Sequence, residues 1–142
     1  REGILFDDLD GHRGYGRLRF YGQSKLANVL FARELSRRLA SRGIAVNAAH
    51  PGVILATRLV RRLSLPVRLG AWLGRRFAKS PAQGAATQVL LAASALVEGV
   101  TGEYWSDCRV AEANPHAGDE AMAARLWAVT EEIIARAVPG AE

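Results

Sequence analysis

A long amphipathic stretch, followed by a glycine and a short strand-like run, is the feature that most constrains the fold. In residues 18–42, apolar side chains recur at three- and four-residue steps, which predicts a helix. Gly43 is a typical helix stop, and the run IAVNAAH after it has strand length and ends at the turn Pro51-Gly52. This order indicates an α/β unit with a loop after the strand. The apolar helix residues are Leu26, Val29, Leu30, Ala32, Leu35 and Leu39.

The rest of the chain predicts two further helices and one further strand. In KSPAQGAATQVLLAAS, Ser80 suits the N-cap, Pro81 the first helical position and Gln83 a capping box, which predicts a helix over residues 81–95. The run EYWSD is typical of a short strand. AGDEAMAARLWAVTEEIIARAV predicts a final helix. Its apolar face comprises Met122, Leu126, Val129, Ile133 and Ile134.

Alternating helices and strands predict the α/β class, with an open and mainly parallel sheet. Only two strands are visible, and two parallel strands do not form a stable sheet. We therefore expect either strands that the pattern misses or a sheet that extends before Arg1. Residues 55–77 are interrupted by Pro66, Gly70 and Gly74, which predicts two short helices.

Composition excludes several classes of protein. The 142 residues are 49% apolar and 23% charged, which suits one globular domain rather than a disordered chain. The net charge is +5, but no aromatic-interleaved basic strand or recognition helix accompanies it, so no nucleic-acid partner is expected. Cys108 is the only cysteine, which excludes an internal disulfide and indicates a reducing, cytoplasmic setting. No metal site is expected, because no ligand spacing surrounds the three histidines, His12, His50 and His116.

Tyr21 and Lys25 stand four residues apart at the start of the long predicted helix, so they share one face. A phenol with its unperturbed pKa of about 10 is a poor acid–base catalyst at neutral pH, but a nearby ammonium favours the phenolate. The spacing therefore suits a proton-transfer pair. The alternative is a packed tyrosine beside a solvated lysine. The chain has only two lysines, which makes a chance match of this pattern uncommon.

The ordered motifs YGQSKLANVLFARELSRRL, VNAAHPG, SPAQGAATQVLLA, VEGVTGEYWSDC and ARLWAVTEE resemble the C-terminal half of the short-chain dehydrogenase/reductase family. The resemblance is to its retinol dehydrogenase-like and WW-domain oxidoreductase-like branch. It spans residues 6–135. It implies that residues 1–142 are the C-terminal half of such a domain, without the dinucleotide-binding half. The fold implied is the C-terminal part of a Rossmann-type, doubly wound parallel sheet.

The resemblance implies an NAD(P)-dependent oxidoreductase and assigns roles to its matching residues. Tyr21 would be the general acid or base at the substrate oxygen, and Lys25 would assist it and hydrogen-bond the nicotinamide ribose. The loop over the nicotinamide would comprise Pro51, Gly52, Val53 and Ile54. Thr57 would contact the carboxamide, although the family usually places this threonine one residue nearer to the Pro-Gly pair. NADP is slightly favoured over NAD.

Some of the family's motifs have no counterpart in residues 1–20, namely the glycine-rich turn, the cofactor selector, the helix-four asparagine and the catalytic serine. Ser24 does not replace that serine, because it lies inside the motif helix beside Lys25. The substrate is expected to be a small, apolar carbonyl compound or alcohol. Because residues 55–77 follow the implied nicotinamide loop directly, we expect them to form a mobile cover over that substrate. A homo-oligomer is left open. Two alternatives remain. The chain could be a non-catalytic remnant or interaction domain, or the segment LVRRLSLPVRLGAWLGRRFAK could bind an anionic membrane surface.

We predict that the 142-residue chain by itself neither binds NAD(P) tightly nor turns over a substrate. Pyrophosphate binding in such sheets needs a glycine turn and a helix N-terminus after the first strand, which residues 1–20 do not offer. We also expect Leu26, Leu30 and Leu35 to be left exposed and the chain to be marginally folded or to associate through them. Calorimetric titration with NADPH and NADH tests this. A low-micromolar dissociation constant together with cooperative thermal unfolding would contradict it.

Overall fold

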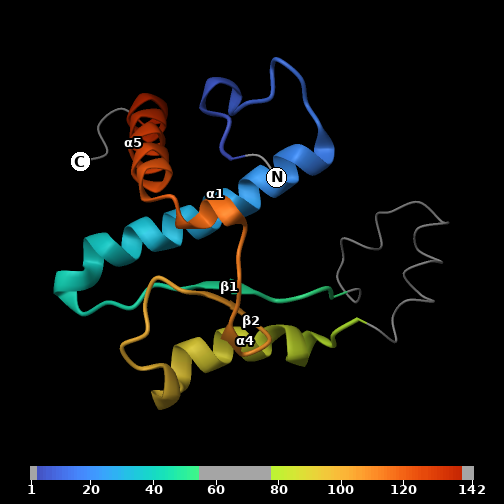
Figure 1. Cartoon of the computed structure of the whole chain (residues 1–142), viewed down its shortest axis with the longest axis vertical. Coiled ribbons are helices and arrows are strands. Elements are labelled where there is room, and N and C mark those ends of the chain that lie inside the picture. The colour runs from blue at the N-terminus through green and yellow to red at the C-terminus, as the bar shows by residue number, and fades with distance from the viewer. Residues whose placement is uncertain (1–2, 55–77, 139–142) are drawn as a thin grey trace. The chain divides into compact units, whose positions relative to one another are not determined.

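The computed structural model describes residues 3–54 and 78–138, which form two compact units (Figure 1). Among the described residues, the first unit draws on residues 3–48, 99–103 and 112–138, and the second on residues 49–54, 78–98 and 104–111. Three α-helices and a three-stranded sheet occur within the described residues. The α/β class predicted from the sequence is confirmed. The predicted helices over 55–77 and the role of Thr57 fall outside the described residues.

The long predicted helix is present in the first unit. Helix α1 spans Arg17–Leu39 and continues into a short 3-10 turn, η2, over Ala40–Arg42. Gly43 follows with a φ of 66°, a left-handed conformation that favours glycine at a helix end. A second 3-10 turn, η1, covers Phe6–Asp8 ahead of α1. The backbone N–H of Leu5 donates to Oε1 of Gln23 at 2.9 Å, which ties this leading segment to α1.

Helix α5, Glu120–Ala137, packs across α1 in the same unit (Figure 1). Leu30 is fully buried and Leu26 is 2% exposed, so the expectation that these two side chains are left uncovered is wrong. Leu35 is half-buried. Burying one leucine side chain stabilises a fold by about 1.5–3 kcal/mol, so these residues form the centre of the core. The predicted apolar face of α5 is only partly right, because Ile133 and Ile134 are about half exposed.

Charged and aromatic side chains reinforce this packing of α5 on α1. Glu34 is buried on α1 and forms ion pairs with Arg37 and Arg38. Arg37 also reaches Oε2 of Glu120, at the start of α5, over 3.0 Å. The ring of Trp127 on α5 lies beneath the Arg38 guanidinium, 4.4 Å from the ring centroid. A buried carboxylate is costly unless it is paired, and these two arginines supply the pairing.

Two distant segments of the first unit are joined mainly by side chains. Asn47 donates from Nδ2 to the carbonyl of Val100 at 2.7 Å and accepts at Oδ1 from the N–H of Glu103 at 3.0 Å. The N–H of Gly102 donates to the carbonyl of Val46, and the N–H of Ala48 donates to the carbonyl of Glu103. Residue numbers increase along both segments from one hydrogen-bonded pair to the next, so the two segments run in the same direction. The predicted strand IAVNAAH is consequently regular only at its end.

The sheet has the order β1-β2-β3, formed by Ala48–His50, Tyr104–Ser106 and Arg109–Val110. Strand β3 is the strand that the sequence pattern missed. It pairs with β2 in antiparallel fashion, with Trp105 opposite Val110 and Ser106 opposite Arg109. The sheet of the described residues is therefore mixed, because a two-residue turn returns the chain directly to its neighbour at this pair.

Helix α4 spans Pro81–Ala93 in the second unit and begins as predicted. Ser80 accepts from the N–H of Gln83, and the Gln83 side chain accepts from the N–H of Ser80, which completes the capping box. A 3-10 turn, η4, follows over Ala95–Val97, and another, η5, covers Pro115–Gly118 before α5. Among the helices in the described residues, none is both long and apolar enough to span a membrane.

Two helical glycines predict opposite effects of an added methyl group. At Gly22 a Cβ would meet no atom within 4 Å, so Gly22→Ala should stabilise the fold by about 0.5–1 kcal/mol through higher helix propensity. At Gly84 a Cβ would overlap Cδ1 of Ile54, so Gly84→Ala should lose that gain and cost about 1–3 kcal/mol. Urea unfolding of the two variants measures the difference. Equal stabilisation by both would show that Ile54 does not pack on Gly84.

Candidate active site

Tyr21 and Lys25 lie on one exposed face of α1, as their spacing predicted. The Nζ of Lys25 is 5.4 Å from the centroid of the Tyr21 ring, within range of a cation–π contact. Tyr21 is 62% exposed. Within the described part of the chain, neither its hydroxyl nor the Lys25 ammonium forms a hydrogen bond or an ion pair. Both polar groups can therefore meet a bound molecule without first breaking another contact.

Ser24 lies between these two residues in the sequence but serves the helix itself. Its Oγ donates to the carbonyl of Tyr21 at 2.8 Å, a local bond that serine commonly forms in helices. Ser24 thus lies inside the helix, as predicted.

The predicted cofactor loop, Pro51 to Ile54, belongs to the second unit and is therefore described separately from the Tyr21 and Lys25 pair. Gly52 has a φ of 76°, in the left-handed region that side chains rarely adopt. The carbonyl of Val53 accepts from the N–H of Lys79 at 3.0 Å. Ile54 packs on α4 at Gly84. The loop thus has a defined backbone course, which is held by the hydrogen bond from Lys79 and by the packing of Ile54 on α4.

Lys79 contacts this loop through both its backbone and its side chain. Its side chain passes directly over Gly52, where a Cβ would lie 2.8 Å from Cδ, Cε and Nζ of the lysine. Its ammonium forms an ion pair with Asp107, in the turn between β2 and β3. The lysine side chain is 26% exposed, and the aspartate side chain is half exposed.

The β2–β3 turn is built from Asp107 and Cys108, which have φ values of 55° and 58°. Positive φ at both central residues is the geometry of a two-residue hairpin turn, normally formed by Asn-Gly or Asp-Gly. Thr87 on α4, only 1% exposed, accepts the N–H of Cys108 at 3.1 Å. This buried hydroxyl fixes a turn whose sequence does not favour it. Cys108 is exposed in this turn.

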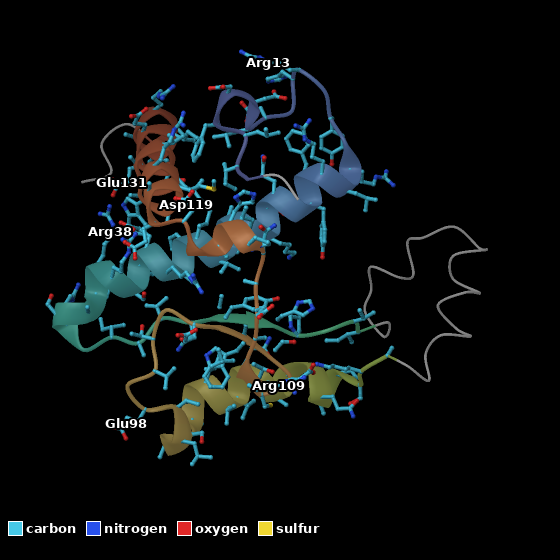
Figure 2. All side chains as sticks on the ribbon, viewed as in Figure 1. Arg13, Arg38, Glu98, Arg109, Asp119 and Glu131 are labelled. Atoms are coloured by element: carbon cyan, nitrogen blue, oxygen red, sulfur yellow. The ribbon has the colours of Figure 1, made fainter. Side chains whose placement is uncertain are left out.

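Electrostatics favour the ionised form of Asp107. The hydrogen bond and positive charge of Lys79 lower the pKa of Asp107 below the ordinary carboxyl value, and Arg109 and His50 add smaller effects in the same direction. Figure 2 labels Arg109, which follows the turn at the start of β3. The His50 ring also stacks on Tyr104, with 6.5 Å between ring centroids.

The described residues hold no group of three or more His, Cys, Asp or Glu side chains arranged to bind a metal ion.

Comparison with known proteins identifies the origin of this arrangement. The profile of the short chain dehydrogenase family matches residues 9–66, a segment that contains Tyr21, Lys25 and the Pro51 to Ile54 loop. Human retinol dehydrogenase 14 is 42% identical over 137 residues, which is 92% of this chain and 40% of that protein. The chain belongs to the short-chain dehydrogenase family.

Other members of the family are similar to the same extent. WW domain-containing oxidoreductase of Pongo abelii is 42% identical over 84% of this chain and 29% of its own length. Short-chain dehydrogenase TIC 32 B, chloroplastic, of Brassica napus is 39% identical over 89% of this chain and 40% of its own length. The chain thus spans less than half the length of each of these three relatives.

Lys79 and Asp107 lie outside the segment matched by the family profile, and sequence reasoning did not single them out as site residues. One signal was available. The chain has nineteen basic residues, of which only Lys25 and Lys79 are lysines, and the structure places both beside residues predicted to bind the cofactor. The partner of Lys79 could not be recognised, because it depends on a turn formed without glycine.

We predict that Lys79→Met raises the pKa of Asp107 toward the ordinary carboxyl value of about 3.9. The folded-state pKa is lowered, so the ion pair stabilises the fold above the unfolded-state value and loses this effect as the pH falls through the folded-state pKa. Carboxyl-carbon NMR titration of Asp107 in both proteins measures the change. An unaltered titration in the variant would show that Lys79 does not set this pKa.

Proposed function

We propose that the protein acts as an oxidoreductase that transfers hydride between a nicotinamide cofactor and a carbonyl or alcohol carbon. The observation that carries this proposal is the exposed Tyr21 and Lys25 pair, 5.4 Å from ammonium to ring centroid, within the segment that matches the family profile. A tyrosine beside a lysine on one helix face is suited to proton transfer at the substrate oxygen.

The described residues fit such a cofactor in two respects. The Lys25 ammonium and the Tyr21 hydroxyl have no hydrogen-bond partner within the described residues, so they are free to meet a ribose and a substrate oxygen. Separately, the Pro51 to Ile54 loop has a fixed course that could present backbone groups to a carboxamide. The cofactor, when bound, supplies or accepts the hydride. NADP is slightly preferred by the family resemblance, and either nucleotide is compatible with these residues.

In this mechanism the protein's residues move the proton. In reduction, the hydroxyl of Tyr21 donates its proton to the carbonyl oxygen as hydride reaches the carbonyl carbon. In oxidation, the phenolate accepts the proton of the alcohol as hydride leaves. Lys25 stabilises the phenolate by its positive charge and would bind the ribose. Each direction balances one hydride and one proton.

The substrate proposed is a small, apolar carbonyl compound or alcohol. Support comes from the relatives, since the human protein at 42% identity is a retinol dehydrogenase by name. A cytoplasmic setting without a nucleic-acid partner remains part of the proposal. The membrane-surface alternative rests almost wholly on residues 59–77, which fall outside the described residues.

We predict that Tyr21→Phe lowers kcat by about 10²-fold or more while the cofactor dissociation constant changes little, because the variant removes only the proton donor. Lys25→Ala should impair both quantities. Retinaldehyde reduction by the natural protein at full length, with NADPH and NADH, is the assay. Tyr15→Phe removes a hydroxyl from another exposed tyrosine and serves as the control. A Tyr21→Phe variant that keeps more than about a tenth of the activity would rule out this role.

A further inference from the structure

We propose that Lys79 is a positioning residue for the Pro51 to Ile54 loop and holds it in the shape that receives the nicotinamide cofactor. The inference rests on the proposed function for the identity of the ligand. Its structural part, the attachment of the loop to the β2–β3 turn through one lysine, stands on the contacts of the second unit alone.

Three different parts of Lys79 engage this part of the fold. Its backbone N–H donates to the carbonyl of Val53 at 3.0 Å. Its aliphatic chain covers Gly52, so closely that any side chain at position 52 would collide with it. Its ammonium pairs with Asp107. A surface lysine that interacts only with solvent makes none of these contacts. Ordering a long side chain costs conformational entropy, which the contacts of Lys79 must offset.

The point of attachment is itself firmly held. Asp107 occupies a left-handed turn position, and the neighbouring Cys108 donates its N–H to the buried hydroxyl of Thr87. Thr87 lies on α4, and α4 also carries Gly84, against which Ile54 packs. The loop is thus fixed at one end through the lysine and at the other through a helix that also supports the turn. A fixed loop binds a ligand with a smaller entropy cost than one that must be ordered on binding.

A purely structural ion pair offers the competing explanation, and the chain supplies a matched comparison. Arg136 and Glu132 form an ion pair on α5 at 3.1 Å, with both side chains well exposed. Exposed pairs of that kind contribute little to stability. Arg136→Met therefore removes a salt bridge and a positive charge without touching the loop, which makes it the control for Lys79→Met.

The experiment uses the natural protein at full length as wild type, Lys79→Met, Asp107→Asn and Arg136→Met. Hydrogen exchange reports on the amide of Lys79, which donates to Val53. We expect it to exchange about tenfold faster in Lys79→Met and Asp107→Asn, because the closed loop loses its anchor, and to be unchanged in Arg136→Met. Unchanged exchange in Lys79→Met would overturn the structural part of the proposal.

Fluorescence titration with NADPH and NADH tests the functional part. Both loop variants should raise the dissociation constant by about tenfold, while kcat at saturating cofactor changes by less than about threefold. The variant that combines Lys79→Met with Asp107→Asn should have a dissociation constant no higher than that of either single variant, because the two residues act as one unit. Faster amide exchange with an unchanged dissociation constant would show that the attachment of the loop through Lys79 has a structural role only. A wild-type protein that binds neither nucleotide would instead overturn the proposed function and, with it, the role of Lys79 in cofactor binding. The exchange experiment would still test the attachment of the loop through Lys79.

Discussion

The packing of α5 on α1 fixes the first unit and, with it, the direction in which Tyr21 and Lys25 point. An α-helix turns by about 100° per residue, so a residue nine positions before Leu30 lies on the opposite side of α1. Leu30 is fully buried, and Tyr21 is therefore turned outward. The Arg37 bridge to Glu120 and the stack of Phe31 on Trp127, with centroids 5.5 Å apart, hold this rotation of the helix in place.

Buried or half-buried polar side chains form hydrogen bonds that, in regular sheets, are formed between the backbones of neighbouring strands. Asn47 uses its amide to join two segments whose backbone ladder is irregular, and Thr87 uses one hydroxyl to satisfy the N–H of a left-handed turn. Each bond satisfies a backbone group that would otherwise be costly to bury. A fold with three strands of two or three residues can therefore remain ordered where its ladders are short.

Local signals predicted what local interactions determine. The capping box at Ser80, the glycine stop at Gly43 and the face shared by Tyr21 and Lys25 all depend on residues within a few positions of one another. Two features escaped prediction because they depend on distant partners. The periodic pattern showed that Leu26 and Leu30 need burial, but not that α5 lies across them. The β2–β3 hairpin lacked the usual glycine signal, so neither β3 nor the partner of Lys79 could be inferred from the sequence.

The two lysines occupy positions where a guanidinium would be the poorer choice. Arginines in this chain use their planar groups, as Arg37 does in bridging two carboxylates and Arg38 in stacking on Trp127. Lys79 instead must pass a slim aliphatic stem over Gly52 and end in a compact charge. Lys25 places the same compact charge beside a phenol while its ammonium stays available to a ligand. Among the described residues, the shape of the contact thus distinguishes these lysines from Arg37 and Arg38. Each of the chain's two lysines lies beside residues that are predicted to bind the cofactor.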